Sequence, residues 1–199
     1  MKNSLKSLLF IALTIMVWSA SVLNSTAAEK SMELTGVPFR RIVVTGNTRV
    51  IIIQSSSDWV TMDDDDISKV SVTQRGDELR INSTEKIPVI VTVHVKELFR
   101  IVALNTSGVT TLGKLEVKYL QVMMSDTAVA RVKTNTESIY TVINGHASLA
   151  LLGSTHKHVL SQSGTVKLDT SKFAALATTV DTTDTRLVMN AIRGHKNKL

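Results

Sequence analysis

Apolar and polar residues alternate along most of the chain with a period of two, which is the pattern of a half-buried β-strand. The clearest run is 89–96, in which valine occupies every odd-numbered position from 89 to 95. Arg75-Gly76-Asp77-Glu78 lies between two shorter alternating runs and predicts a tight hairpin. The best helix candidate, 171–178, has no clear cap. The pattern therefore predicts an all-β fold.

From Phe99 onward a larger unit recurs, made of an alternating strand, a turn of small residues and a second short strand. The turns of the five units are 105–108, 125–128, 144–148, 161–165 and 181–186. If Val109, Val129, Leu149, Val166 and Leu187 are equivalent, the successive steps are 20, 20, 17 and 21 residues. An irregular period of about 20 residues with two strands per unit is typical of a β-solenoid.

This repeat predicts a β-solenoid of about five rungs, in which each rung pairs in parallel with the next at a spacing of about 4.8 Å. Stacking would bury a continuous apolar core that no single rung can bury alone. The segment before Phe99 is predicted to form N-terminal β-hairpins that cap one end. An antiparallel sandwich is the alternative, because its strands also recur at short intervals. Recurrence of the whole two-strand unit favours the solenoid.

The composition agrees with strands and excludes several kinds of site. The chain has 199 residues, the length of one ordinary domain, and about a third of the residues beyond position 28 are Val, Ile or Thr. It contains no Cys. This excludes disulfides, thiolate metal sites, a cysteine nucleophile and a lipid anchor on an N-terminal cysteine.

The first 28 residues have the features of a secretory signal peptide. Lys2 and Lys6 precede an apolar stretch over 8–17, and Ser25-Thr26-Ala27-Ala28 supplies the small residues that a signal peptidase requires. The stretch is short for a membrane span of about 20 residues, and an uncleaved anchor is the alternative. We expect an exported protein, periplasmic, at the cell surface or secreted, with no membrane span after cleavage. The predicted organisation is a signal peptide (1–28), a linker (29–36), one domain (37–192) and a basic C-terminal tail (193–199).

The charge distribution argues against a nucleic-acid partner. The formal charge of +6 falls to +4 when Lys2 and Lys6 leave with the leader, and much of the excess lies in the tail. Aromatic residues make up 4% of the chain and are scattered. A nucleic-acid-binding domain would instead show a basic stripe with stacking aromatics.

One run of carboxylates is a weak candidate for Ca²⁺, which prefers oxygen ligands. Its members are Asp63, Asp64, Asp65 and Asp66. Consecutive side chains point in different directions, so a solvated turn is the simpler interpretation. We therefore predict no bound metal or cofactor, with Ca²⁺ at this run as the alternative.

Histidines form a second, incomplete set of potential metal ligands. His156 and His158 could share one side of a strand, with Asp169 and His146 on neighbouring rungs. Two histidines without an adjacent acid do not complete a zinc site. Solvent-facing histidines are the simpler interpretation.

The acidic residues offer little support for catalysis. A glycosidase needs two carboxylates at roughly 5–10 Å across a groove. Asp126 and Asp184 are predicted in turns three rungs apart, and Asp181 and Asp184 share one corner. The sequence has no Gly-x-Ser-x-Gly, phosphate-loop or His-Glu-x-x-His motif. We predict no enzymatic activity, and a weak polysaccharide-active enzyme is kept as an alternative.

Phe39 to Gly46 (FRRIVVTG), Val50 to Gln54 (VIIIQ) and the hairpin over 60–81 carry a family resemblance. Over about residues 37–190, the chain resembles the putative auto-transporter adhesin, head GIN domain family of exported bacterial proteins. The later turns are similar to the family's Ser-Gly-Ser-Gly-Asp-Val turns, although Asp126-Thr127 and Thr183-Asp184 stand where glycines are expected. The resemblance implies a right-handed parallel β-helix outside the cytoplasm.

These observations together predict an exported, non-catalytic, adhesin-like module that recognises a glycan, a polymer or an envelope protein. The predicted contact surface is the stack of turn residues Ser107, Asp126, His146, Ser163 and Thr183. An alternative is a structural or assembly module, in which the terminal rung docks a second copy or another chain by edge pairing.

Overall fold

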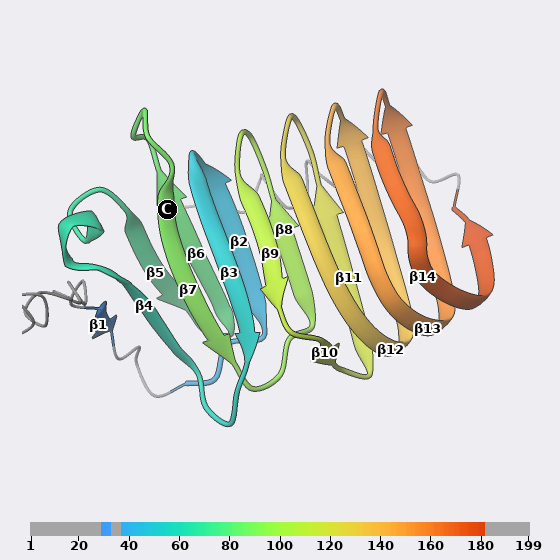
Figure 1. Cartoon of the computed structure of the whole chain (residues 1–199), viewed down its shortest axis with the longest axis horizontal. Coiled ribbons are helices and arrows are strands. Elements are labelled where there is room, and N and C mark those ends of the chain that lie inside the picture. The colour runs from blue at the N-terminus through green and yellow to red at the C-terminus, as the bar shows by residue number, and fades with distance from the viewer. Residues whose placement is uncertain (1–28, 33–36, 182–199) are drawn as a thin grey trace, which may run out of the picture.

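The computed structural model describes residues 29–32 and 37–181, and within them the fold is all-β, as predicted (Figure 1). The strands before the repeat are β1 (Glu29–Met32), β2 (Arg41–Gly46), β3 (Thr48–Gln54), β4 (Trp59–Asp63), β5 (Ser71–Arg75), β6 (Glu78–Ser83) and β7 (Val89–Val95). A short 3-10 helix, η1 (Asp64–Asp66), follows β4. The later strands are β8 (Arg100–Ala103), β9 (Gly108–Leu112), β10 (Leu115–Glu116), β11 (Tyr119–Met124), β12 (Val129–Gly145), β13 (Ser148–Gly164) and β14 (Lys167–Val180).

These strands form one curled, mostly parallel sheet whose two halves face each other across the core. One half, here called the β2 face, contains β5, β6, β2, β8, β11 and the second halves of β12, β13 and β14. The other half, the β3 face, contains β1, β4, β7, β3, β9 and the first halves of the same three long strands. Tight turns join the faces at the upper edge in Figure 1, and the long strands curve from one face to the other at the lower edge.

Successive units pair in parallel, but their register differs from the predicted one. Val109 pairs with Ala130, Ala130 with Leu149, and Leu149 with Leu168, so the steps are 21, 19 and 19 residues. The predicted equivalents Val129 and Val166 are therefore wrong by one and two positions, and Leu187 lies outside the described residues. Val129 points outward and is 55% exposed, whereas the smaller Ala130 faces the core. At this position the inward residue is the smaller of the two, so an alignment by the larger apolar residue shifts the register by one.

The predicted row of N-terminal hairpins is only partly correct. β5 and β6 do form the predicted antiparallel hairpin, with Gly76 in the turn at φ +57°. β2 and β3 do not pair with each other: β2 lies parallel between β6 and β8, and β3 lies parallel between β7 and β9. Both strands carry inward apolar side chains, so the chain crosses the core at Gly46 and Asn47 instead of folding back within one face.

The helix candidate over 171–178 is wrong, because these residues lie within β14. Among the described residues the helical structure is confined to η1. Thr178 and Thr179 pair with the neighbouring strand, and the alternating side chains of this segment suit a pleated strand better than a helical stripe.

The core is a continuous column of small and β-branched side chains that runs through the stacked units. Its largest fully buried members are Phe39, Ile42, Ile52, Leu79, Ile81, Ile101, Leu115, Leu120, Met124, Ile139, Ile143 and Leu149. Each such side chain contributes about 1.5–3 kcal/mol by leaving water.

One corner of the tight-turn edge repeats in conformation although its sequence varies. Left-handed residues stand there in five successive units: Gly46, Asn105, Asp126, Gly145 and Gly164, with φ of 69°, 60°, 65°, 75° and 85°. Asn and Asp are the non-glycine residues that best tolerate this region. Asp126 thus replaces a glycine without loosening the turn, and its Oδ2 accepts a hydrogen bond from Asn105 N at 3.0 Å.

Candidate functional site

The residues predicted as a binding stack lie on the tight-turn edge but not in one column. Ser107 is fully buried and is equivalent in register to Ala128 and Ala147. Asp126 stands at the left-handed corner, and the exposed His146 donates its backbone N–H to the Asp126 carbonyl at 2.7 Å.

Ser163 lies at a further register position of the same edge. Its hydroxyl donates to Oδ1 of Asn144 at 2.9 Å. Thr183 lies outside the described residues. A binding role for these five residues stays a prediction, but the Ser107 side chain is not on the surface.

The aspartate run forms a turn after β4. Asp63 caps η1 by accepting from the backbone N–H of Asp65 at 3.3 Å, and Asp66 pairs with Lys69 at 2.9 Å. Within 29–32 and 37–181, no three His, Asp or Glu side chains converge as a metal site would require. The geometry supplies no calcium cage at Asp63–Asp66.

The predicted histidine set is separated by the fold. His156 is exposed on β13, whereas His158 is buried, with its Nε2 3.1 Å from the Thr141 hydroxyl. Asp169 is exposed and accepts from Ser171 N at 2.9 Å. His146 stands at the tight-turn edge.

The carboxylates considered for catalysis are also held in separate contacts. Asp126 bonds the Asn105 backbone, and Asp181 accepts a hydrogen bond from the Tyr140 hydroxyl at 3.2 Å. Asp184 lies outside the described residues. For the alternative of a polysaccharide-active enzyme, the structure therefore places Asp126 and Asp181 in separate contacts and not in a pair.

The opposite edge carries a groove that the turn-based prediction missed. A depression of about 390 Å³ forms where β3 and β7 end and β11 begins. Its polar and aromatic lining includes Arg40, Lys96, Glu97, Glu116, Lys118 and Tyr119. A second depression of about 330 Å³ shares Glu116 and Lys118 and adds Asn135, Glu137 and His156. Because the two share lining residues, they adjoin each other on neighbouring units, and together they are here called the edge groove.

The edge groove continues past Arg40 toward the start of the domain. A depression of about 170 Å³ shares Arg40, Lys96 and Glu97 with the first and adds Pro38 and Asp58. The Asp58 carboxylate accepts from the backbone N–H of Lys96 at 2.6 Å, which fixes the chain at this point. The groove therefore runs along the stack instead of into it.

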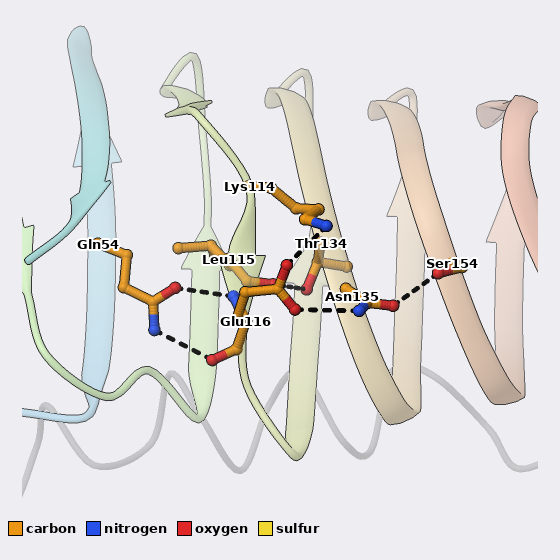
Figure 2. Close-up of polar contacts among 7 residues, drawn as sticks. All are labelled: Gln54, Lys114, Leu115, Glu116, Thr134, Asn135 and Ser154. Carbon is orange, nitrogen blue, oxygen red and sulfur yellow. Dashed lines mark hydrogen bonds and ion pairs between the residues drawn. The ribbon is translucent and has the colours of Figure 1, made fainter.

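A ladder of side-chain hydrogen bonds holds the floor of the edge groove (Figure 2). The Gln54 amide bonds both backbone groups of Glu116, accepting from its N at 2.7 Å and donating to its O at 3.0 Å. The Glu116 carboxylate accepts from Asn135 Nδ2 at 3.0 Å, and Asn135 Oδ1 accepts from the Ser154 hydroxyl at 2.6 Å. Gln54 thereby replaces the main-chain pairing that ends with β3 and fixes the neighbouring unit.

Charges of both signs line the edge groove. Lys114 pairs with Glu116 at 2.6 Å, and this bond, with that from Asn135, lowers the pKa of the Glu116 carboxyl. Lys118 lies 3.8 Å from Glu137 across the second depression. The groove thus offers carboxylates paired with ammonium groups, with no excess of one sign.

Tyr119 is the exposed aromatic residue of this surface. Half of its side chain is open to solvent, and Lys118 Nζ lies 5.4 Å from the ring centroid. An exposed ring among hydrogen-bonding groups presents an apolar face with polar surroundings. This combination suits a ligand that is both flat and hydroxylated.

The sequence does contain a signal for this groove. Glu116, Asn135 and Ser154 are spaced by 19 residues and occupy paired positions on neighbouring strands. Aligning units by their polar positions would have found the ladder, whereas alignment by apolar residues and turns did not.

Within the described residues, no helix has the length and hydrophobicity needed to cross a membrane. No curated protein matches the chain in sequence. Several solved structures share the fold at low sequence identity. A putative adhesin from Bacteroides fragilis superposes with a TM-score of 0.66 at 14% identity, covering 77% of this chain and 74% of that one.

Two structures from Parabacteroides distasonis are also similar in fold to this chain. One, a putative adhesin, gives a TM-score of 0.58 at 17% identity, with 78% of each chain covered. The other, described as a putative lipid binding protein, gives 0.56 at 10% identity, again with 78% of each chain covered. The family described as putative auto-transporter adhesin, head GIN domain, matches residues 38–184. Because the family's model matches most of its length, the chain belongs to that family.

Proposed function

We propose that this protein is an exported, non-catalytic binding module whose edge groove holds an extended glycan. The observation that carries the proposal is the row of adjoining depressions on neighbouring units, which places hydrogen-bonding groups beside Tyr119. A linear polymer can follow such a groove, and sugar rings can stack on an exposed aromatic face. The shared carboxylate, amide and ammonium groups match the hydroxyls of a sugar chain.

The family supports export, because its description is that of an adhesin. We infer that residues 1–28 are removed as a signal peptide and that the curled sheet is a right-handed parallel β-solenoid. N-terminal mass analysis of the protein recovered from its native cell tests the first inference. A mature protein that begins at Glu29 is expected, and a retained Met1 would contradict cleavage.

Binding is tested with a panel of soluble polysaccharides and the purified protein. Tyr119→Ala is expected to weaken binding at least ten-fold, because it removes the stacking surface, and Tyr119→Phe should retain most of the affinity. Leu112→Ala is the matched control, since Leu112 is exposed at 63% on the outer side of the β3 face. Equal affinities of Tyr119→Ala and the unmodified protein would exclude the edge groove as the glycan-binding site.

The tight-turn edge is the competing surface and can be separated from the groove by one variant. His146→Ala changes an exposed residue of that edge and leaves the groove intact. Loss of glycan binding in His146→Ala with retention in Tyr119→Ala would place the contact at the turns. Hydrolysis of any bound polysaccharide would favour the enzyme alternative instead.

A second candidate function is assembly through β14. Within the described residues this strand pairs with β13 alone, and Leu176 and Val180 are 84% and 64% exposed. An unpaired edge with apolar side chains is suited to strand addition. Sedimentation over a wide concentration range tests it: oligomers that Leu176→Lys disperses would support assembly, and a monomer throughout would oppose it.

A further inference from the structure

The outer side of the β3 face carries a cluster of exposed basic residues. Its members are Arg49 on β3, Arg131 and Lys133 on β12, and Lys167 and Lys172 on β14. Each stands next to a residue that belongs to the core or packs against it, as Arg49 stands next to Val50. Because successive side chains of a strand point to opposite faces, all five basic side chains point away from the core.

The positive charge of the described domain is concentrated in this cluster. Residues 37–181 contain 16 Lys and Arg and 14 Asp and Glu, which gives a net charge of +2. The cluster holds five of these cations together with one acid, Asp169 on β14. Its own net charge is therefore +4, and the remainder of residues 37–181 carries −2.

Among the residues that the structure describes, none of the five cations has a carboxylate partner in a direct ion pair. The direct ion pairs join Arg41 with Asp77, Lys69 with Asp66, Arg80 with Glu78, Lys114 with Glu116, and Lys118 with Glu137. Asp169 bonds Ser171 instead, and this bonding, followed by the charges of Lys172 and Arg131, lowers the pKa of its carboxyl. The cluster therefore presents its charge to a partner.

Two exposed apolar side chains stand among these cations. Val129 on β12 is 55% exposed, and Leu112 on β9 is 63% exposed. Val129 lies in the register row that joins Arg49 to Lys167. Leu112 follows Thr111, whose hydroxyl accepts from the backbone N–H of Lys133 at 2.8 Å. The five cations with Leu112 and Val129 are here called the outer patch.

The outer patch extends in two dimensions. Its strands lie side by side in the order β3, β9, β12, β13 and β14 (Figure 1). Arg49 and Lys167 are four strand spacings apart, or about 19 Å, and Lys133 lies four residues beyond Val129 on its strand, or about 13 Å. A linear polyanion could follow one row of this array, whereas a plane of negative charge reaches all of it.

From these observations we propose that the outer patch docks the protein on an anionic lipid surface. The cations lie among the phosphate headgroups, while Val129 and Leu112 enter the boundary of the acyl chains. A soluble acidic polymer would engage the cations but gain nothing from exposed apolar side chains, and two copies docked patch to patch would oppose like charges. The inference does not depend on the proposed glycan binding, because no residue of the outer patch lines the edge groove.

Flotation of the purified exported protein with lipid vesicles tests the proposal. One set of vesicles contains phosphatidylcholine alone, and in the other about a third of the lipid is phosphatidylglycerol. We expect a partition coefficient at least about ten-fold higher on the anionic vesicles, and a decrease as NaCl is raised, because salt screens exposed charges. Equal partitioning to the two sets, or binding to neither, would overturn the proposal.

A pair of charge reversals locates the contact. Arg131→Glu combined with Lys133→Glu should lower partitioning to the anionic vesicles at least about ten-fold. Lys86→Glu combined with Lys157→Glu is the matched control, because both residues are exposed outside the outer patch and the net charge changes equally. The control should stay within about two-fold of the unmodified protein. Equal losses in the two pairs would overturn the proposal, and glutamine replaces glutamate at all four positions if a reversed variant does not fold.

The apolar contact has its own variant. Val129→Ser should lower partitioning several-fold even at high salt, because it removes an apolar side chain from the acyl boundary. Ile87→Ser is the matched control: Ile87 is 79% exposed between β6 and β7 and should have no effect. Unchanged partitioning in Val129→Ser would contradict insertion.

Other occupants of the outer patch give different results. Tight binding of soluble polyglutamate without vesicle binding would assign the patch to an acidic polymer and overturn the proposal. Concentration-dependent dimers in sedimentation that the Arg131→Glu and Lys133→Glu pair disperses, again without vesicle binding, would assign it to a second copy. Loss of glycan binding in Tyr119→Ala tests the edge groove separately, so the two proposals can fail independently.

Discussion

The hydroxyl of Thr141 lies 3.1 Å from Nε2 of His158, and both side chains are buried between β12 and β13. The ring of Phe173 meets the imidazole edge-on, with the ring centroids 5.8 Å apart. Burial disfavours the imidazolium and lowers the pKa of His158 from its ordinary value of 6.5. This pair therefore links the stability of the stack to pH.

The first prediction concerns that link. Well above pH 6.5 the imidazole is neutral in both the folded and the unfolded protein. As the pH falls below this value, the unfolded chain binds the proton first, so the free energy of unfolding decreases. The loss is complete once the pH has passed through the lower pKa of the folded state. Urea unfolding at a series of pH values measures it.

The variant His158→Gln should lack this component of the pH dependence. His156→Gln is the matched control, because His156 is exposed on the same strand and should leave the slope unchanged. Identical pH slopes in His158→Gln and the unmodified protein would contradict the assignment.

A second prediction compares two glycines with similar left-handed conformations. Gly46 has φ +69° and Gly76 has φ +57°. A Cβ at Gly46 would lie 2.0 Å from the carbonyl oxygen of Ser83, whereas a Cβ at Gly76 meets nothing within 4 Å. Gly76→Ala should cost about 1–2 kcal/mol from conformation alone. Gly46→Ala must also displace the β6 backbone, so its loss of thermal stability should be clearly larger, and equal losses would contradict the crossing geometry.

The third prediction addresses the ladder of the edge groove. Gln54→Ala removes two hydrogen bonds to the Glu116 backbone and should cost about 1–3 kcal/mol. Gln54→Glu keeps an acceptor for Glu116 N but turns a carboxylate oxygen toward the carbonyl oxygens of Glu116 and Lys96, so its cost should be at least that of Gln54→Ala. Amide exchange at Glu116 separates this local effect from global unfolding. Unchanged exchange in Gln54→Ala would show that the amide does not hold the strand.

The sequence predicted where the strands lie along the chain better than it predicted which strands pair with one another. The alternation over 89–96 corresponds to β7, and the turn at Gly76 joins β5 to β6 as predicted. Both features are local. The placement of β2 between β6 and β8 depends on contacts between segments far apart in the chain, which period and turn chemistry do not encode.

The candidate site was missed for a related reason. Turn residues such as Ser107 were chosen because small polar residues mark corners, yet the fold buries that side chain. Glu116, Asn135 and Ser154 lie at the other edge, and their common role becomes visible only when the register of β10, β12 and β13 is known. Asn105 and Asp126 likewise adopt the left-handed conformation that glycine has at the equivalent corners, so the sequence alone does not mark these corners.

The last prediction separates the backbone role of Asp126 from its surface role. Asp126→Asn keeps a side chain that tolerates φ of 65° and can accept from Asn105 N, so its stability should be close to that of the unmodified protein. Asp126→Gly tolerates the left-handed backbone but loses the hydrogen bond from Asn105 N. Asp126→Ala loses that bond and also strains the backbone, which together should lower the free energy of unfolding by about 1–3 kcal/mol. Thermal unfolding should therefore rank Asn first and Ala last. A different order, with Ala equal to Asn, would mean that the corner does not depend on this residue. Reduced glycan binding by the stable Asp126→Asn variant, with Tyr119→Ala unaffected, would place recognition at the tight-turn edge.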